Sequence, residues 1–332
     1  MTKWLRLIRP GDWTKNVFVL LALLFWLPNH LRSQSGVDLT SSLATVLVAT
    51  ALAFVAFCAA ASGFYCVNDA LDSARDRLHP VKKHRPVAAG AISRGQAIVL
   101  GAGLILLGIT AGFAASKGAG ACLVAYAVLQ AAYNLGLKRV IFVDVVTLAI
   151  GFSLRAACGA LAIGVQVSPW LLACVFSVTL YLGFIKRLCD LSSARRVNNS
   201  EWRSPAGYDN PFELNWLLGM SGTLTVLMYL LYALSTHAQR IFGVRAVGLA
   251  LLTPLVLIVV HRFFRRANEG LSDSPLAALI EDRAVAIAIA LFVLGAGVTL
   301  YVPEAQTVLG KLFLTEPIPV MSAPGSPSTP TS

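Results

Sequence analysis

The sequence predicts an all-α integral membrane protein built as a bundle of nine membrane-spanning helices. Two observations lead to this fold class. Of the 332 residues, 57% are hydrophobic and only 13% are charged, about half the charged fraction of a soluble domain. The hydrophobic residues also gather in runs of about 20, the length that a helix needs to cross a hydrocarbon core of about 30 Å. Most of the surface is therefore expected to face lipid.

Nine apolar segments are expected to form the spans, and short loops that carry most of the charges separate them. In chain order they cover residues 13–31, 42–67, 96–115, 119–137, 141–165, 169–185, 212–235, 244–260 and 284–302. The first segment is the least regular, because its apolar stretch is short and contains Pro28. Residues 1–303 are expected to make one catalytic domain. The tail, residues 315–332, is rich in Pro and Ser and is expected to be disordered.

The distribution of charge predicts the orientation of the bundle. Most of the 27 Lys and Arg residues precede the first segment or follow an even-numbered one. Because Lys and Arg are enriched in cytoplasmic loops, this places the N-terminus in the cytoplasm and, with nine spans, the C-terminus outside. Nearly all of the 16 Asp and Glu residues lie on the same side, which the positive-inside rule does not require. The cytoplasmic face of the cell membrane is therefore expected to carry a functional site.

Two other function classes are disfavoured. The net charge of +11 is spread over short loops between apolar segments, so it does not indicate a nucleic-acid partner. The six cysteines lie in or at the ends of the apolar segments and form no CxxC pair. They are interpreted as buried apolar residues rather than as a disulfide framework or a metal site.

An acidic motif ends the second span. Its polar residues are Asn68, Asp69, Asp72 and Asp76. If the helix continues, the three aspartates lie within about 60° of one another on one face. Such carboxylates repel one another unless cations join them, and Mg²⁺ suits oxygen ligands that leave positions open for phosphate. The three aspartates are therefore predicted to be metal ligands and catalytic residues. The alternative is a solvated acidic helix end neutralised by neighbouring arginines.

A basic loop follows, in which Pro80 and Pro86 interrupt helix formation. Its candidate phosphate-binding residues are Arg77, Lys82, Lys83 and Arg85. Cations beside an acidic cluster indicate a polyanionic ligand between the two groups. Its phosphates would contact a metal ion held by the acids on one side and Lys and Arg on the other. Ordinary positive-inside charge would explain the sign of the loop but not its position beside the acids. Anionic lipid headgroups are a further alternative.

Three more polar groups are candidates. Tyr133, Lys138 and Asp144 lie where the fourth and fifth spans join. Arg155 follows about 16 Å deeper on the face of Asp144, where a charge indicates either a function in an internal cavity or a structural hydrogen bond to carbonyls of a neighbouring helix.

The sixth span ends on Lys186 and Arg187, with Asp190 four residues after Lys186 in ion-pair spacing. Asp273, Glu281, Asp282 and Arg283, before the last span, are given a loop or gating role. Four of the five polar groups lie at cytoplasmic ends of even-numbered spans, so a bundle is expected to gather them at one cavity mouth.

These motifs resemble the UbiA superfamily of intramembrane prenyltransferases, which have nine helices, an NDxxDxxxD motif after the second span and a polar motif after the fourth. Within it the chain is most similar to the decaprenyl-phosphate phosphoribosyltransferases, over about residues 6–302. The discriminating stretches are Arg9-Pro10-x-x-Trp13-x-Lys15-Asn16 and His79-Pro80-x-Lys82-x-x-Arg85-Pro86. One departure is Asp190, where that branch has Glu, and this puts loop geometry or substrate preference in doubt.

The resemblance implies a donor, phosphoribosyl pyrophosphate, and an acceptor, polyprenyl (decaprenyl) phosphate, in the synthesis of arabinofuranosyl donor precursors. The lipid phosphate would attack the anomeric carbon with inversion as pyrophosphate leaves, with Mg²⁺ on the three aspartates neutralising the leaving group. The acceptor phosphate is already an anion, so no general base is expected. The implied substrate-binding residues are Lys15, Asn68, Arg77, Lys82, Lys83, Arg85, Tyr133, Lys138, Asp144, Arg155, Lys186, Arg187 and Tyr208.

Two rival functions stay open. A UbiA-type prenyltransferase would use the same carboxylates with a prenyl diphosphate donor and an aromatic or other acceptor. A transporter would need charges and broken helices near the membrane midplane, and only Arg155 fits that description. A homo-oligomer is also left open.

Overall fold

The computed structural model describes residues 3–32, 39–78, 82–196, 206–269 and 281–313. Within these ranges every regular element is a helix, as the sequence predicts. Eight helical segments are long and apolar enough to cross a membrane. The chain is therefore a multi-pass membrane protein. The predicted disordered tail, the loop residues His79 and Pro80, and Asp273 lie outside the described ranges.

Each of the eight spans overlaps one predicted segment, although the helices of the sixth and eighth segments continue well past the predicted ends at 185 and 260. Seven are single helices: α3 (Leu39–Leu71), α5 (Arg94–Ala115), α6 (Lys117–Leu135), α7 (Val143–Ala162), α8 (Pro169–Arg196), α9 (Pro211–Leu234) and α14 (Arg283–Tyr301). The eighth consists of α11 (Arg245–Ala250) and α12 (Thr253–Glu269). The interruption coincides with Pro254, which lacks the N–H that an uninterrupted helix would use.

The predicted first span, 13–31, is not among the eight. Its residues form a 3₁₀ helix, η1 (Pro10–Leu20), that leads into α2 (Leu21–Arg32). Neither element alone is long enough to be a span, although end to end they reach roughly 40 Å. The described part of the chain thus has eight spans by length and composition, and the ninth stays a prediction.

Short helices that hydropathy did not predict lie at the ends of the spans. They are α1 (Lys3–Ile8), α4 (Ser73–Asp76), η2 (Lys82–His84), η3 (Leu137–Arg139), α10 (Thr236–Phe242) and α15 (Pro303–Phe313). Most have fewer than eight residues, and a window sized for a membrane span cannot detect them.

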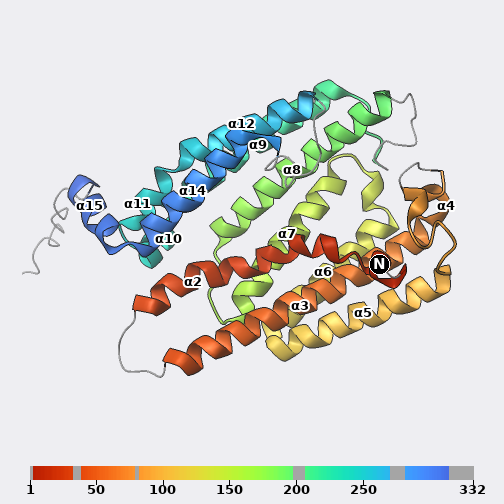
Figure 1. The fold of residues 1–332 in the computed structure, drawn as a ribbon, viewed down its shortest axis with the longest axis horizontal. Coiled ribbons are helices and arrows are strands. Elements are labelled where there is room, and N and C mark those ends of the chain that lie inside the picture. Colours follow the sequence, from red (N-terminus) through yellow and green to blue (C-terminus); the bar gives the residue numbers. More distant parts are fainter. Residues whose placement is uncertain (1–2, 33–38, 79–81, 197–205, 270–280, 314–332) are drawn as a thin grey trace, which may run out of the picture.

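Glycines bring α3 and α5 together along their length (Figure 1). A Cβ on Gly63 would lie 2.6 Å from the carbonyl oxygen of Gly101, and a Cβ on Gly101 would lie 2.8 Å from that of Gly63. The two backbones therefore touch, as in membrane helix pairs with small residues at the interface.

Helix α7 lies at the centre of the bundle, because it contributes to two separate cores. Ala157 and Cys158 of α7 pack with residues of α3 and α6. Val145 and Ala149, closer to its start, pack with residues of α8, α9, α12 and α14. Polar residues carried by α7 are therefore held between the two groups of helices seen in Figure 1.

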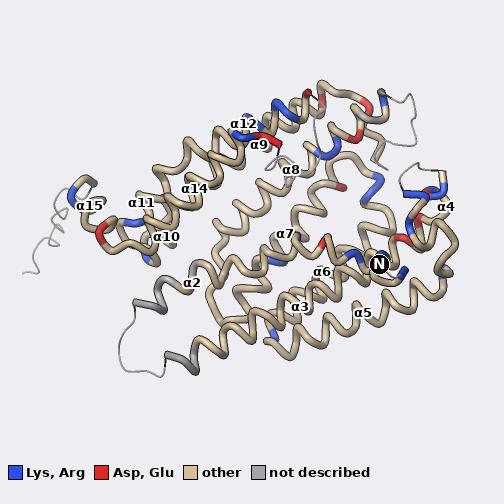
Figure 2. Tube along the Cα trace, in the orientation of Figure 1, with Lys and Arg blue, Asp and Glu red and all other residues tan. Residues whose placement is uncertain are grey.

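Charged residues are concentrated at one end of the bundle, near α4, the start of the chain and the adjoining ends of α8 and α12 (Figure 2). A smaller group lies near α10, α11 and α15, and the helices between carry few charges. We call the first region the charged end. The side of the membrane that it faces stays a prediction.

Candidate active site

The acidic motif spans a bend in the chain. Helix α3 ends at Leu71 and α4 begins at Ser73, while Asp72 adopts φ −88° and ψ 1°. The helix that the spacing argument assumed is therefore distorted at Asp72, although the Asp72 N–H still donates to the Asn68 carbonyl at 2.8 Å and the Asp76 N–H to the Asp72 carbonyl at 2.9 Å. The Asp72 side chain does not cap α4; its carboxylate accepts from Lys138 instead.

Asp69 and Asp76 converge on one guanidinium group. Arg85 Nη1 donates to Asp69 Oδ1 at 3.2 Å and to Asp76 Oδ2 at 2.7 Å. Arg9 also donates to Asp69 Oδ1. Both carboxylates are buried. The opposite charge comes from Arg85 of the basic loop and from Arg9 near the start of the chain.

Asp72 is turned toward a different cation. Lys138, buried in η3, donates to both carboxylate oxygens of Asp72 at 2.8 and 2.9 Å, and to Asn68 Oδ1 at 3.3 Å. The three aspartates thus have different partners in the structure. Two lie with Arg85, and the third joins α3 to η3.

The carboxylates fit a metal site made by two ligands. Among the described residues, no three Asp, Glu, His or Cys side chains are grouped closely enough to hold a metal ion. Mg²⁺, however, commonly takes one or two protein carboxylates together with substrate phosphates. Asp69 Oδ2 is buried and has no hydrogen-bond partner among the described residues, and a cation would satisfy it. Asp69 and Asp76 therefore fit Mg²⁺, and Asp72 in this arrangement does not.

The basic loop lies against the acidic motif. Arg77 Nε donates to the Ala88 carbonyl oxygen at 3.1 Å, and Arg94 Nε donates to Ser73 Oγ at 2.7 Å. Lys82 is partly buried, and burial followed by the positive charge of Arg85 lowers its pKa, while Asp76 and Asp190 oppose that change. Lys82 therefore lies where charges of the acidic motif and of α8 both act on it.

A second buried cluster joins α7, α8 and the segment before α9. Asp144 accepts hydrogen bonds from Arg187 Nε, the Tyr208 hydroxyl and the Val145 N–H, each at 2.8 Å. Asp190 Oδ2 lies 3.5 Å from Arg187 Nη1, and Tyr133 is hydrogen-bonded to Arg187. The members of the cluster therefore position one another.

Tyr208 links this cluster to a strained turn. Its hydroxyl accepts a hydrogen bond from the Phe142 N–H at 2.7 Å, and Phe142 adopts φ +70°, a region that costs a non-glycine residue about 1–3 kcal/mol. Burial, and then the bond to Asp144, raise the pKa of Tyr208, so it stays a neutral donor. Phe142 stands between η3, which carries Lys138, and α7, so the turn fixes one cluster relative to the other.

The N-terminal motif is docked on α3. Trp13 Nε1 donates to Ser62 Oγ at 2.9 Å and Asn16 Nδ2 to Cys58 Sγ at 3.2 Å. Arg9 stacks on the Tyr65 ring at 5.1 Å and, like Phe142, has a positive φ, +50°. The segment from Arg9 to Asn16 therefore delivers the Arg9 guanidinium to Asp69.

Arg155 is buried inside the protein, away from lipid. It donates to Asn16 Oδ1 at 2.8 Å, to the Gly151 carbonyl oxygen at 2.8 Å and to the Tyr126 hydroxyl at 3.1 Å. Its guanidinium also lies over the rings of Phe57, Tyr126 and Phe152. Protein groups thus occupy all three of its nitrogens, which favours the structural alternative over a contact with substrate.

The structure brings most predicted site residues to the charged end. Those in or between the two clusters are Asn68, Asp69, Asp72, Asp76, Lys82, Arg85, Tyr133, Lys138, Asp144, Arg187 and Tyr208. Lys15, Arg77, Lys83 and Lys186 are exposed at the surface, and Lys15 pairs with Asp12 at 2.6 Å. Arg9 and Asn16 were not predicted as site residues, although the N-terminal motif contained both.

The predicted gating residues before α14 form a helix cap. Asp282 accepts from the Ala284 and Val285 N–H groups at 3.0 and 3.3 Å, and its carboxylate binds Arg262 of α12 at 2.8 Å. The ion pair and the cap tie α12 to α14. A structural role accounts for these contacts.

The fold is an apolar helical bundle with buried acidic and basic clusters at one end. These features define a class of membrane protein that carries a polar site at one end of its spans. Family comparison places it within that class. Residues 17–280 match the model of the UbiA prenyltransferase family, so the chain belongs to this family and is a transferase. The resemblance expected from the motifs is confirmed.

Two relatives carry the same enzyme name. The chain is 34% identical over 238 residues to the decaprenyl-phosphate phosphoribosyltransferase of Corynebacterium glutamicum, covering 70% of this chain and 68% of that protein. It is 28% identical over 287 residues to the decaprenyl-phosphate phosphoribosyltransferase of Mycolicibacterium smegmatis, covering 85% and 87%. A UbiA homologue from Archaeoglobus fulgidus bound to GPP and Mg²⁺ has the same fold, with a TM-score of 0.63, 18% identity and coverage of 91% of this chain and 100% of that one.

Proposed function

We propose that the protein transfers a 5-phosphoribosyl group from phosphoribosyl pyrophosphate to a polyprenyl phosphate and releases pyrophosphate. The observation that carries the proposal is the pairing of four carboxylates, three of them buried, with cations from four parts of the chain, Arg9, Arg85, Lys138 and Arg187. A donor with phosphates at both ends needs such cations in more than one place. The two phosphoribosyltransferase relatives support the same substrates.

The reaction needs little proton transfer. An anionic oxygen of the lipid phosphate forms a bond to the anomeric carbon of the ribose, and the bond from that carbon to the pyrophosphate oxygen breaks with its electron pair. Pyrophosphate leaves from the opposite face, so the anomeric centre is inverted. The protein's task is then to orient two anions and stabilise the charge of the leaving group.

Asp69 and Asp76 would hold Mg²⁺, while Asn68 accepts from Lys138 together with Asp72. The ion would act as a Lewis acid and neutralise the negative charge that develops on the leaving pyrophosphate. Arg85 touches both carboxylates and is the residue best placed to contact pyrophosphate oxygens as well. Lys82 and Lys138 flank the same region from the basic loop and η3. Because Asp72 holds Lys138, its role is to orient that cation.

The second cluster would position the other end of the donor or the lipid phosphate. Arg187 is held by Asp144, Asp190 and Tyr133, which fixes its guanidinium without a substrate. We assign Asp144 and Tyr208 to positioning rather than to substrate contact. The charged end is assigned to the cytoplasmic face of the cell membrane, where phosphoribosyl pyrophosphate would be supplied.

A second candidate is prenyl transfer from a prenyl diphosphate. The Archaeoglobus fulgidus homologue was solved with GPP and Mg²⁺, and the same carboxylates would assist a diphosphate leaving group in either reaction. The acidic motif alone therefore does not separate the two donors.

The test compares the donors directly on the full-length protein purified in detergent with Mg²⁺. Radiolabelled phosphoribosyl pyrophosphate is offered with decaprenyl phosphate, and labelled prenyl diphosphates are offered with aromatic acceptors. The proposal predicts label in the lipid only from phosphoribosyl pyrophosphate. Prenylated product without phosphoribosyl transfer would replace the proposal with the second candidate.

A further inference from the structure

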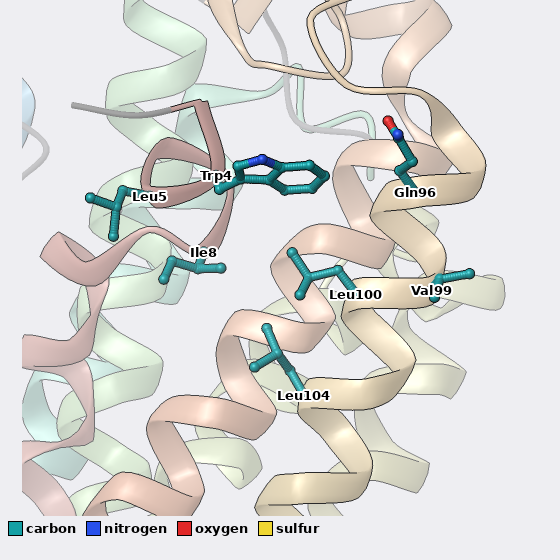
Figure 3. A pocket seen from close by; sticks show the side chains of 7 residues that line it. All are labelled: Trp4, Leu5, Ile8, Gln96, Val99, Leu100 and Leu104. Atoms are coloured by element: carbon teal, nitrogen blue, oxygen red, sulfur yellow. The ribbon is translucent and has the colours of Figure 1, made fainter.

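An apolar groove of about 710 Å³ lies between α1 and α5, apart from the candidate active site. Its walls are formed by Trp4, Leu5, Ile8, Gln96, Val99, Leu100 and Leu104 (Figure 3). The Trp4 ring extends across toward α5, while Leu100 and Leu104 point back toward α1. The volume falls within the range of about 300–1,000 Å³ that small-molecule sites occupy.

The groove runs from the charged end into the apolar span. Helix α5 begins at Arg94, and the wall residues from Gln96 to Leu104 cover about 12 Å of its length. Val99 is 73% exposed on a helix apolar enough to cross the membrane. The open side of the groove is therefore expected to face lipid chains. Its end at Gln96, next to the charged end of the bundle, is expected to lie at the level of the lipid headgroups.

A packed layer separates the groove from the carboxylates. Leu7, Cys66, Ala70 and Ala97 are buried together beneath it, with Ile8 packed against them. A chain seated in the groove would therefore lie outside the acidic cluster. This geometry disfavours the acceptor lipid as the occupant, because the acceptor phosphate must reach the reacting centre.

The headgroup end of the groove is positively charged. Lys3 Nζ lies 5.7 Å above the Trp4 ring and donates to the Ala91 carbonyl oxygen at 3.2 Å. Arg6, on the same short helix, is exposed. Neither residues 1–11 nor residues 77–117 contain an Asp or Glu, so both segments that build the groove carry only positive charge. A tryptophan beside a lysine is typical of a membrane interface.

We propose that the groove seats one acyl chain of an anionic glycerophospholipid, whose phosphate contacts Lys3 and lies within the positive potential to which Arg6 of the same helix contributes. An acyl chain gains little by leaving bulk lipid for an apolar wall, so the headgroup determines the selectivity. Each cation near an anionic headgroup contributes about five-fold in affinity, or ~1 kcal/mol. The two cations together predict a preference of about 30-fold for phosphatidylglycerol over phosphatidylcholine.

The test is native mass spectrometry of the full-length protein, titrated with each of these phospholipids in detergent. Leu100→Trp fills the groove and is expected to weaken the first phosphatidylglycerol binding event at least ten-fold. Leu106→Trp is the matched control, because Leu106 is 64% exposed on the same helix but does not line the groove. Its binding is expected to equal that of the wild type. Lys3→Gln combined with Arg6→Gln is expected to leave little preference between the two lipids without changing the wall.

Four outcomes would overturn the proposal, and the first three concern the phospholipids. The wild type could bind both phospholipids equally, the two tryptophan variants could bind alike, or the charge variant could keep the full preference. Decaprenyl phosphate is the competitor that identifies the occupant. If it displaces phosphatidylglycerol from the wild type at equal concentration, and Leu100→Trp weakens the binding of decaprenyl phosphate itself, the groove holds the acceptor and the proposal is wrong.

Discussion

Replacing Asp144 with asparagine tests whether the ion pair between α7 and α8 holds the second cluster together. Asp144 is 0% exposed, and its main partner, Arg187, is 7% exposed. The change keeps the shape of the side chain but removes the charge that three donors share. Arg187 would be left with Asp190, which is partly exposed and lies 3.5 Å away.

The expected cost follows from this geometry. Removing one partner of a buried ion pair costs about 3–5 kcal/mol, and the remaining Asp190 places Asp144→Asn at the lower end, near ~3 kcal/mol. Tyr208→Phe removes two hydrogen bonds, the one donated to Asp144 and the one accepted from the Phe142 N–H, and is expected to cost about 2–3 kcal/mol. Arg187→Met combined with Asp144→Asn removes both charges, so its loss should be well below the sum of the single losses.

Thermal unfolding of the purified protein in one detergent measures these differences. Asp144→Asn is expected to lower the apparent Tm by roughly 5 °C, and turnover should fall because Arg187 is no longer fixed. An unchanged Tm for Asp144→Asn would refute the reasoning, and so would a double variant whose loss equals the sum of its parts.

Three further predictions concern the metal ligands, the docking of η1 and the topology. Asp76→Asn should lower turnover about 100-fold or more, since a charge-assisted contact contributes up to about 3 kcal/mol. Asp12→Asn, which removes the exposed pair with Lys15, should leave turnover unchanged. Equal activity in the two variants would remove Asp76 from the site. Gly159→Ala would place a methyl group 1.8 Å from the Val19 carbonyl oxygen and should lower the Tm by several degrees. Gly103→Ala is the control, because a Cβ there has nothing within 4 Å, and its Tm should not change. If the two variants behave alike in thermal unfolding, η1 does not pack against α7 at Gly159. Lys83→Cys should react with a membrane-impermeant maleimide in inverted vesicles but not in intact cells, and the reverse pattern would place the charged end outside.

Hydropathy predicted the membrane helices well where composition changes sharply at their ends. The predicted segments 96–115 and 284–302 differ from α5 and α14 by no more than two residues at either end. In both cases the first helical residue is an arginine after a capping side chain, Ser93 or Asp282, so the apolar run and the helix begin together.

Hydropathy failed where a helix continues beyond the membrane. The sixth segment was predicted to end at Ile185, but α8 runs to Arg196. Lys186, Arg187 and Leu188 are good helix formers, although the first two are unfavourable in lipid. Apolar composition indicates which part of a helix lies in lipid. Where the helix ends depends instead on the helix propensity of its residues.

The residue types of the site could be predicted, but their pairing could not. Spacing within one helix suggested that Asp69, Asp72 and Asp76 act together. Their actual partners are Arg9, Lys138 and Arg85, two of which lie 60 and 66 residues away along the chain. Periodicity describes one element at a time, and such distant pairs depend on how the helices pack.

The central claim is tested most directly by the mass of the lipid product. Purified protein with Mg²⁺, decaprenyl phosphate and phosphoribosyl pyrophosphate should yield a lipid heavier than decaprenyl phosphate by one phosphoribosyl group, with one pyrophosphate released per lipid. Asp69→Asn should yield neither. Unchanged decaprenyl phosphate with the wild-type protein, alongside prenyl transfer to another acceptor, would contradict the account.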